Sequence, residues 1–172
     1  MKKLIMTTTT ALFLATTVFA ANPIPGAEDG FTHYSTVEGW NVFSDAESEA
    51  CFIERADESG NVVQVGLTKN QKHSYFGVFT LADVKIKRKE KFEVDINGFV
   101  YDGKARGMKS KKLRGDYKGG YFVIKDDNMV NAIMQEGTMT VLPKKKDAFQ
   151  INLTGIGAAI EEARTCTASM SS

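Results

Sequence analysis

The sequence predicts a mainly β protein, an antiparallel β-sandwich or barrel of about eight short strands with two short helices. Three observations support this fold class. Short runs of alternating apolar and polar residues recur along the chain, turn-forming residues separate them, and two segments have the apolar spacing of a helix. Short strands at regular spacing, joined by turns, are typical of antiparallel sheets.

The segment 1–20 has the features of a signal peptide. Lys2 and Lys3 provide a positive start, residues 7–19 are mostly apolar or small, and Val-Phe-Ala ending at Ala20 fits a signal peptidase site. The apolar run is shorter than the roughly 20 residues that a spanning helix needs, so a membrane anchor is the weaker interpretation. We therefore expect cleavage after Ala20 and an exported protein, periplasmic or secreted, that does not span the membrane.

Removal of the signal peptide leaves 152 residues (172 minus 20), enough for one domain with a single core. Residues 21–38 contain proline and glycine without an apolar period and predict an extended N-terminal arm. We expect a single β-rich domain over residues 39–166 and a disordered tail over residues 167–172. The mature chain has 20 basic residues (22 minus 2) and 21 acidic residues, so its net charge indicates no particular partner.

The first strands are predicted at residues 39–43, which contain the single tryptophan, and at residues 50–54. A turn at residues 57–61 precedes two β-rich runs at residues 62–68 and 74–81. The polar turn between these two runs predicts a hairpin. The second run is almost entirely apolar, which predicts a strand covered on both faces.

The strongest local signal is Asn97-Gly98, which lies between two alternating runs in residues 92–101. This dipeptide predicts a two-residue type I′ turn, because both central positions of that turn need a positive φ. The apolar residues that then share one face of the hairpin are Phe92, Val94, Ile96, Phe99 and Tyr101. A slip by one residue would turn this whole set toward water, so the register is strongly specified.

The basic, glycine-rich residues 104–120 predict a long loop or an irregular sheet edge, and residues 121–125 predict a strand. Asp126 then predicts the N-cap of a short helix that ends before Gly137.

The C-terminal part predicts a last hairpin between residues 138–142 and 149–153. A second helix follows Gly155 and ends near Cys166. Its apolar side consists of Ile156, Ala159, Ile160 and Ala163.

Cys51 and Cys166 are the two cysteines of the chain. In an exported protein an even cysteine count predicts a disulfide, which here would close a loop of more than a hundred residues. The chain-entropy model gives such a loop about 4–5 kcal/mol of stabilisation. A redox pair or a metal site is the alternative, but there is no C-x-x-C motif, and His33 and His73 have no ligand-like spacing from either cysteine.

Several weak motifs occur in a recognisable order. After the signal peptide come a tryptophan-containing strand (residues 40–43) and Cys51, a β-rich middle, and a helix that ends in a methionine-glycine region (residues 131–137). The chain closes with Leu153-Thr154-Gly155, an alanine-rich helix and Cys166. This order resembles the invasion-associated locus B family of exported alphaproteobacterial proteins, over most of the mature chain. The resemblance implies an all-β exported protein, linked in some pathogens to host-cell invasion, and it brings no established catalytic residues.

No nucleophile motif of the Gly-x-Ser-x-Gly or Ser-x-x-Lys type is present in the sequence. Residues 95–98 begin like a calcium loop, but the glycine comes two positions early and no closing Glu follows, so the hairpin explains them better. Residues 126–128 fit a helix cap better than a metal site. We therefore expect a protein that is not an enzyme and that needs no metal and no cofactor.

Basic residues concentrate between Lys85 and Lys118, where 12 basic and 5 acidic residues give a net charge of +7. Such a charge distribution can attract an anionic surface, for example lipopolysaccharide. The alternative interpretation is a solvated loop beside an edge strand that lysines protect from pairing. The anion-binding candidates are Lys104, Arg106, Lys109, Lys111, Lys112, Arg114 and Lys118.

Two classes of function remain open. The first is a non-enzymatic binding protein whose partner is an anionic surface such as lipopolysaccharide, or an envelope or host protein. The second is a small secreted hydrolase inhibitor or an accessory subunit that acts through a loop. Nucleic acid is not an expected partner of an exported protein. Salt-sensitive binding would indicate the first class, and salt-tolerant binding the second.

Overall fold

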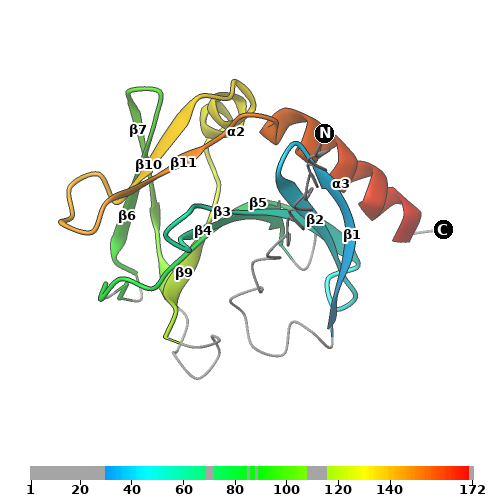
Figure 1. The fold of residues 1–172 in the computed structure, drawn as a ribbon, viewed down its shortest axis with the longest axis horizontal. Coiled ribbons are helices and arrows are strands. Elements are labelled where there is room, and N and C mark those ends of the chain that lie inside the picture. Colours follow the sequence, from blue (N-terminus) through cyan, green and yellow to red (C-terminus); the bar gives the residue numbers. More distant parts are fainter. Residues whose placement is uncertain (1–29, 69–71, 85, 88, 108–115, 171–172) are drawn as a thin grey trace, which may run out of the picture.

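The computed structural model describes residues 30–68, 72–84, 86–87, 89–107 and 116–170. These residues form eleven strands and two helices, with the strands in two antiparallel sheets that share one core (Figure 1). The predicted fold class is confirmed, and the two open sheets make the structure sandwich-like. The predicted signal peptide, residues 1–20, lies outside the described residues.

The large sheet has the strand order β1-β2-β3-β4-β5-β9-β8. Its strands are β1 (Phe31–Val37), β2 (Trp40–Asp45), β3 (Ala50–Ala56), β4 (Val62–Leu67), β5 (Ser74–Thr80), β9 (Lys118–Val123) and β8 (Arg106–Gly107). The first five strands are consecutive antiparallel neighbours, which includes the hairpin predicted between β4 and β5. Strand β5 is buried from Phe76 to Thr80, as its apolar sequence predicts.

The small sheet has the strand order β11-β10-β6-β7. Its strands are β6 (Lys91–Ile96), β7 (Phe99–Lys104), β10 (Thr138–Val141) and β11 (Phe149–Asn152). Both predicted hairpins, β6–β7 and β10–β11, are present, and pairing of β10 with β6 joins them into one sheet. Strand β7 therefore lies at one edge of the small sheet.

The turn between β6 and β7 has the predicted residues and register. Asn97 has a φ of 53° and Gly98 a φ of 88°, so both central positions are left-handed. Ile96 lies opposite Phe99, and Val94 lies opposite Tyr101. On the predicted apolar face, Phe92, Val94 and Ile96 of β6 are buried, whereas the side chain of Phe99 is 68% exposed. The difference arises because Phe99 lies on the edge strand, at the tip of the hairpin.

Replacing Gly98 by valine is expected to destabilise the protein by about 1–3 kcal/mol, because a β-branched residue is strained at a positive φ. An added Cβ would meet nothing within 4 Å at this position, so backbone strain would be the cause. Gly98→Asn is the control, since asparagine tolerates the left-handed region. Thermal unfolding measures both variants, and equal melting temperatures for valine, asparagine and wild type would contradict the turn assignment.

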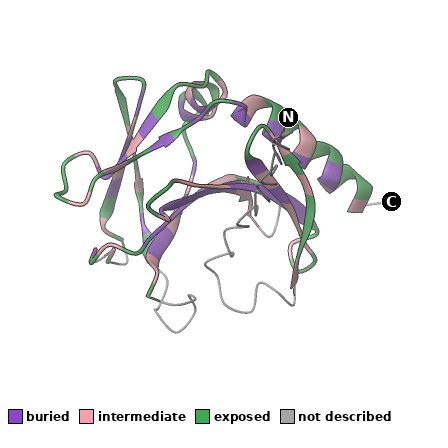
Figure 2. Ribbon diagram, in the orientation of Figure 1, coloured by how far each residue is buried: buried purple, intermediate pink, exposed green. Residues whose placement is uncertain are grey.

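Within the part of the chain that the structure describes, two helices cover the sheets. Helix α2 (Asp127–Met134) has the predicted N-cap, because the Asp126 side chain accepts a hydrogen bond from the backbone N–H of Asn128. Helix α3 (Ile156–Met170) lies across β1, β2 and β3 (Figure 1), and Figure 2 shows buried residues concentrated in the central strands of the large sheet. Neither helix within the described residues has the length and apolar character needed to cross a membrane.

Trp40 fixes the start of α3 against the large sheet. Its indole is fully buried, and its Nε1 donates a hydrogen bond to the carbonyl oxygen of Thr154 at 3.0 Å. The guanidinium of Arg55 lies over the indole ring, 5.6 Å from its centroid, and donates to the same carbonyl oxygen at 2.8 Å. The turn before α3 is therefore held by two donors from β2 and β3.

The folded region extends beyond the predicted limits at both ends. Strand β1 occupies most of the described part of the predicted arm, and α3 continues to Met170 instead of giving way to a tail at residue 167. Strand β1 was missed because an edge strand pairs through its backbone and needs little apolar alternation; its residues are intermediate or exposed. The end of α3 was missed because its residues are small and polar, and the contact of Thr167 with β3 fixes it.

Candidate functional site

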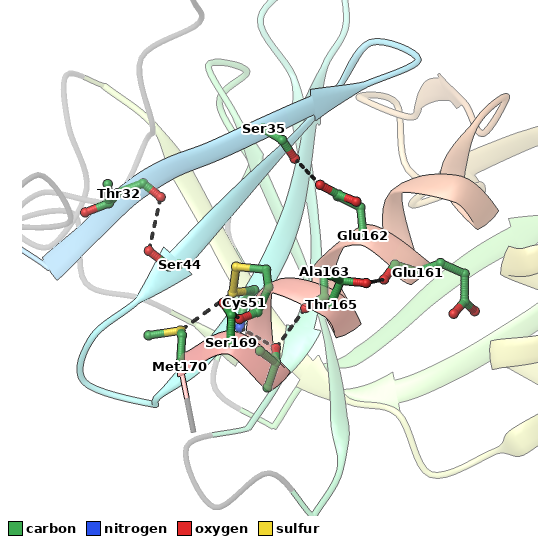
Figure 3. The surroundings of a disulfide bond; sticks show 12 residues. Thr32, Ser35, Ser44, Cys51, Glu161, Glu162, Ala163, Thr165, Ser169 and Met170 are labelled. Carbon is green, nitrogen blue, oxygen red and sulfur yellow. Dashed lines mark hydrogen bonds between the residues drawn. A yellow bond between two sulfur atoms is a disulfide. The ribbon is translucent and has the colours of Figure 1, made fainter. Parts of the chain in front are cut away.

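The predicted disulfide is present and links β3 to α3. Cys51 and Cys166 are both buried, with their Cα atoms 5.9 Å apart. The backbone N–H of Cys51 donates to the Thr167 hydroxyl at 2.9 Å, and the sulfur of Met170 lies 3.6 Å from that of Cys51 (Figure 3). One turn earlier in α3, the Ser35 hydroxyl donates to the Glu162 carboxylate at 3.1 Å, which ties the helix to β1 (Figure 3). The environment is that of a structural cystine.

The anion-binding candidates divide into two groups. Lys109, Lys111, Lys112 and Arg114 lie outside the described residues. Of the described candidates, Lys118 forms an ion pair with Asp83. Lys104 at the end of β7 and Arg106 in β8 are exposed, and the described residues contain no ion pair with either of them.

Lys104 and Arg106 lie on the wall of a groove with a volume of about 1110 Å³. Strand β7 and the start of β8 form one wall. The opposite wall consists of the end of β9, the residues that connect it to α2, and the first turn of α2. The groove therefore lies where the edge of the small sheet meets the last strands of the large sheet.

The floor of the groove is aromatic. Phe122 of β9 is buried, and its ring packs against those of Phe76 and Phe92, with both pairs of centroids 5.5 Å apart. A side chain at Gly103 of β7 would collide with the Phe122 ring. Glycine at this position therefore lets the two sheets approach each other, which gives the groove its base.

Four exposed cations line the groove: Lys89, Lys104, Arg106 and Lys125. Its two carboxylates already have partners within the fold, because Asp102 lies 3.7 Å from the ammonium of Lys91 and Asp126 caps α2. No ion pair within the described ranges engages any of the four cations. The groove therefore presents an excess of positive charge.

The acidic residues of the neighbouring hairpin do not neutralise this charge in the described structure. Glu93 lies 3.0 Å from the ammonium of Lys91 and 2.9 Å from that of Lys144. Its hydrogen bonds with Lys144 and Lys91 lower the pKa of its carboxyl. Asp95 accepts a hydrogen bond from the backbone N–H of Gly98. These carboxylates therefore already have partners within the small sheet, its turn and the loop that contains Lys144.

Sequence reasoning identified two of the four groove cations and missed the others as site residues. Lys89 belongs to the predicted basic run, but nothing distinguished it from its lysine neighbours. Lys125 lies alone between a predicted strand and a predicted helix cap, so no sequence pattern distinguishes it. It lines the same groove as β7 because β9, which precedes it and belongs to the other sheet, packs against β7.

A second, mainly apolar pocket of about 340 Å³ lies between the large sheet, α2 and α3. Ile53, Val65, Val130 and Ile160 are among its lining residues, and Arg164 on its wall pairs with Glu161 at 2.5 Å. Arg164 is the one charged residue among the described residues that line this pocket, and it is thus already paired. Among the described residues, no three His, Cys, Asp or Glu side chains gather in the manner of a metal site.

One ionisable group has an unusual environment. Glu54 of β3 is 1% exposed, and one of its carboxylate oxygens accepts a hydrogen bond from Gln64 at 2.6 Å. The other oxygen has no hydrogen-bond partner among the described residues. Burial raises the pKa of this carboxyl to about 7, and the hydrogen bond from Gln64 opposes that rise. Glu54 does not line the basic groove.

Comparison with protein-family models and with curated proteins found no match. Comparison with solved structures found the crystal structure of invasion associated protein B from Bartonella henselae, with a TM-score of 0.50 and 12% sequence identity. The superposition covers 76% of this chain and 95% of that chain. The resemblance noted in the sequence is thus confirmed for the fold, and this chain has a fold similar to that of invasion associated protein B.

Proposed function

We propose that this is an exported, non-enzymatic binding protein, periplasmic or secreted, that holds an anionic partner from the envelope or a host in the groove beside β7. The observation that carries the proposal is the set of four exposed cations, Lys89, Lys104, Arg106 and Lys125, without ion pairs in the described structure. The buried disulfide supports an oxidising compartment outside the cytoplasm.

The form of the groove favours binding over catalysis. Its charged groups are guanidinium and ammonium groups on exposed positions, which attract and orient an anion. The carboxyl whose pKa is strongly raised, that of Glu54, is buried and does not line the groove that holds these cations. The arrangement therefore supports recognition of negative charge by a rigid, disulfide-linked scaffold.

Reversing two groove charges, in the variant Lys104→Glu/Arg106→Glu, is expected to weaken binding of poly-glutamate and of lipopolysaccharide by about tenfold or more at low salt. The melting temperature should change little, because both side chains are exposed and without ion pairs in the described structure. Wild-type affinity should also fall between low salt and about 0.15 M, where exposed charges are screened beyond about 8 Å.

Lys146→Glu is the matched control for the single variant Lys104→Glu. Each changes the net charge by the same amount at an exposed position without an ion pair in the described structure, and Lys146 does not line the groove. If the control weakens binding as much as the groove variant, net charge and not the groove is responsible. If neither variant changes binding, the proposed function is wrong.

A further inference from the structure

We propose that the groove takes an acidic polypeptide segment in extended conformation, and that this segment pairs with β7 as an added strand of the small sheet. The inference rests on the proposed function and specifies the chemical class of the partner. It depends on the backbone of β7, whereas anion binding alone needs only the side-chain charges.

Strand β7 has an unpaired edge in the part of the chain that the structure describes. Among the described strands, β6 is its only neighbour. All six residues of β7, Phe99–Lys104, line the groove, so the free edge faces this space along its whole length. Six extended residues span about 20 Å, which is enough to pair with one short strand.

The hairpin register determines which backbone groups are free. In a two-residue hairpin the residues that flank the turn, Ile96 and Phe99, form a hydrogen-bonded pair, and such pairs then alternate along the ladder. Tyr101 and Gly103 therefore also bond to β6. The N–H and C=O groups of Val100, Asp102 and Lys104 therefore point away from β6, along the strand that lines the groove.

The other exposed sheet edges are less suited to strand addition. Strand β1 has an irregular register between His33 and Ser35, and bulges of this kind hinder pairing at an edge. Strand β11, the opposite edge of the small sheet, has four residues. Strand β7 has six residues, two more than β11, and unlike that of β1 its pairing is regular throughout.

The side chains around β7 indicate the composition of the segment. Phe99 is 68% exposed and Val100 is 53% exposed at the start of the strand. Lys104 and Arg106 follow at its end, and Lys125 lies across the groove. A complementary strand would carry apolar residues opposite Phe99 and Val100 and carboxylates opposite the cations.

The same charges argue against a second copy of this chain as the partner, because pairing of two β7 edges would bring together two sets of cations. A sulfated or phosphorylated polysaccharide would satisfy the cations but has no peptide backbone to pair with the free edge. The exposed apolar residues and the regular edge thus favour a polypeptide.

The experiment selects random eight-residue segments, displayed on a carrier protein, for binding to the disulfide-bonded protein. The enriched segments should combine acidic and apolar residues. Their affinity is then measured for wild type, Val100→Pro and Val100→Ala. Proline removes an outward N–H that β6 does not use, and its ring obstructs the edge. We expect Val100→Pro to lose about tenfold or more in affinity, and Val100→Ala, which keeps the N–H, to lose far less.

Heparin serves as the polyanion without a peptide backbone. Its binding should be the same for Val100→Pro and wild type and should fall for Lys104→Glu/Arg106→Glu. If acidic segments depend on the two cations but bind Val100→Pro and Val100→Ala equally, strand addition is wrong while the proposed function stands. Binding of heparin without enrichment of acidic segments would likewise exclude strand addition and leave the proposed function standing. If neither ligand depends on Lys104 and Arg106, both proposals are wrong.

Modified ligands test the same pairing without altering the protein. In an enriched segment, alternate residues direct their N–H groups toward β7. N-methylation of this set should remove the hydrogen bonds to β7 and weaken binding by about tenfold. N-methylation of the other alternating set should have much less effect, because those N–H groups point away from β7. Equal effects of methylating the two sets would exclude an added strand, whatever the stability of the Val100→Pro variant.

Discussion

Replacing both cysteines, in the variant Cys51→Ser/Cys166→Ser, is expected to lower the free energy of unfolding by about 2–5 kcal/mol. The bridge spans 115 residues, and the chain-entropy model gives a loop of that length nearly 5 kcal/mol. Both sulfur atoms are buried, so their replacement by hydroxyl groups adds a desolvation cost. Denaturant unfolding measures the change.

Reduced wild-type protein provides the control for this prediction. It lacks the same cross-link but keeps both side chains as thiols, so it should be less stable than the oxidised protein and somewhat more stable than the serine variant. Mass measurement after alkylation without reductant should find no free thiols in the native protein. Equal stability of oxidised and reduced wild type would contradict a stabilising role for the bridge.

The buried carboxyl of Glu54 is expected to make the protein less stable as the pH rises. The native carboxyl keeps its proton up to a pKa of about 7, whereas the unfolded chain releases it near the ordinary value of 4.5. Between these values the native state binds more protons than the unfolded state, so stability falls with increasing pH. The difference between the two pKa values corresponds to a loss of about 3 kcal/mol by pH 8.

Glu54→Gln removes the titration and keeps an oxygen that can accept from Gln64. Denaturant unfolding between pH 5 and pH 8 should give a falling curve for wild type and a much flatter one for the variant. Tyr75 and Tyr117, whose pKa values are raised by burial and also by the charge of Glu54, titrate above this range. The difference between the two proteins therefore isolates Glu54. Parallel curves would show that Glu54 is not the cause.

Features encoded in a few neighbouring residues could be predicted from the sequence. Asn97-Gly98 determines its turn through backbone conformation, and the register of β6 and β7 follows from that turn. The cap at Asp126 likewise depends on local hydrogen bonding. Strand β1 could not be predicted, because its place in the sheet depends on pairing with β2 and on contact with α3.

The candidate site could be predicted only in part, for a similar reason. The basic run indicated Lys104 and Arg106, but it also indicated Lys118, whose partner Asp83 lies far away in sequence. Charge along the chain does not reveal which cations are paired. The groove itself depends on two strands from different sheets meeting at Gly103 and Phe122, a contact that no local pattern encodes.

For an exported protein, as we propose this chain to be, the position of the bridge has a consequence for the order of assembly. In a chain translocated from its N-terminus, Cys51 emerges 115 residues ahead of Cys166. During that interval it is a single thiol on a strand whose cover, helix α3, has not yet left the channel. A wrong bond at that stage requires another molecule, because no other cysteine of the same chain has emerged. The bridge can therefore form only after α3 arrives.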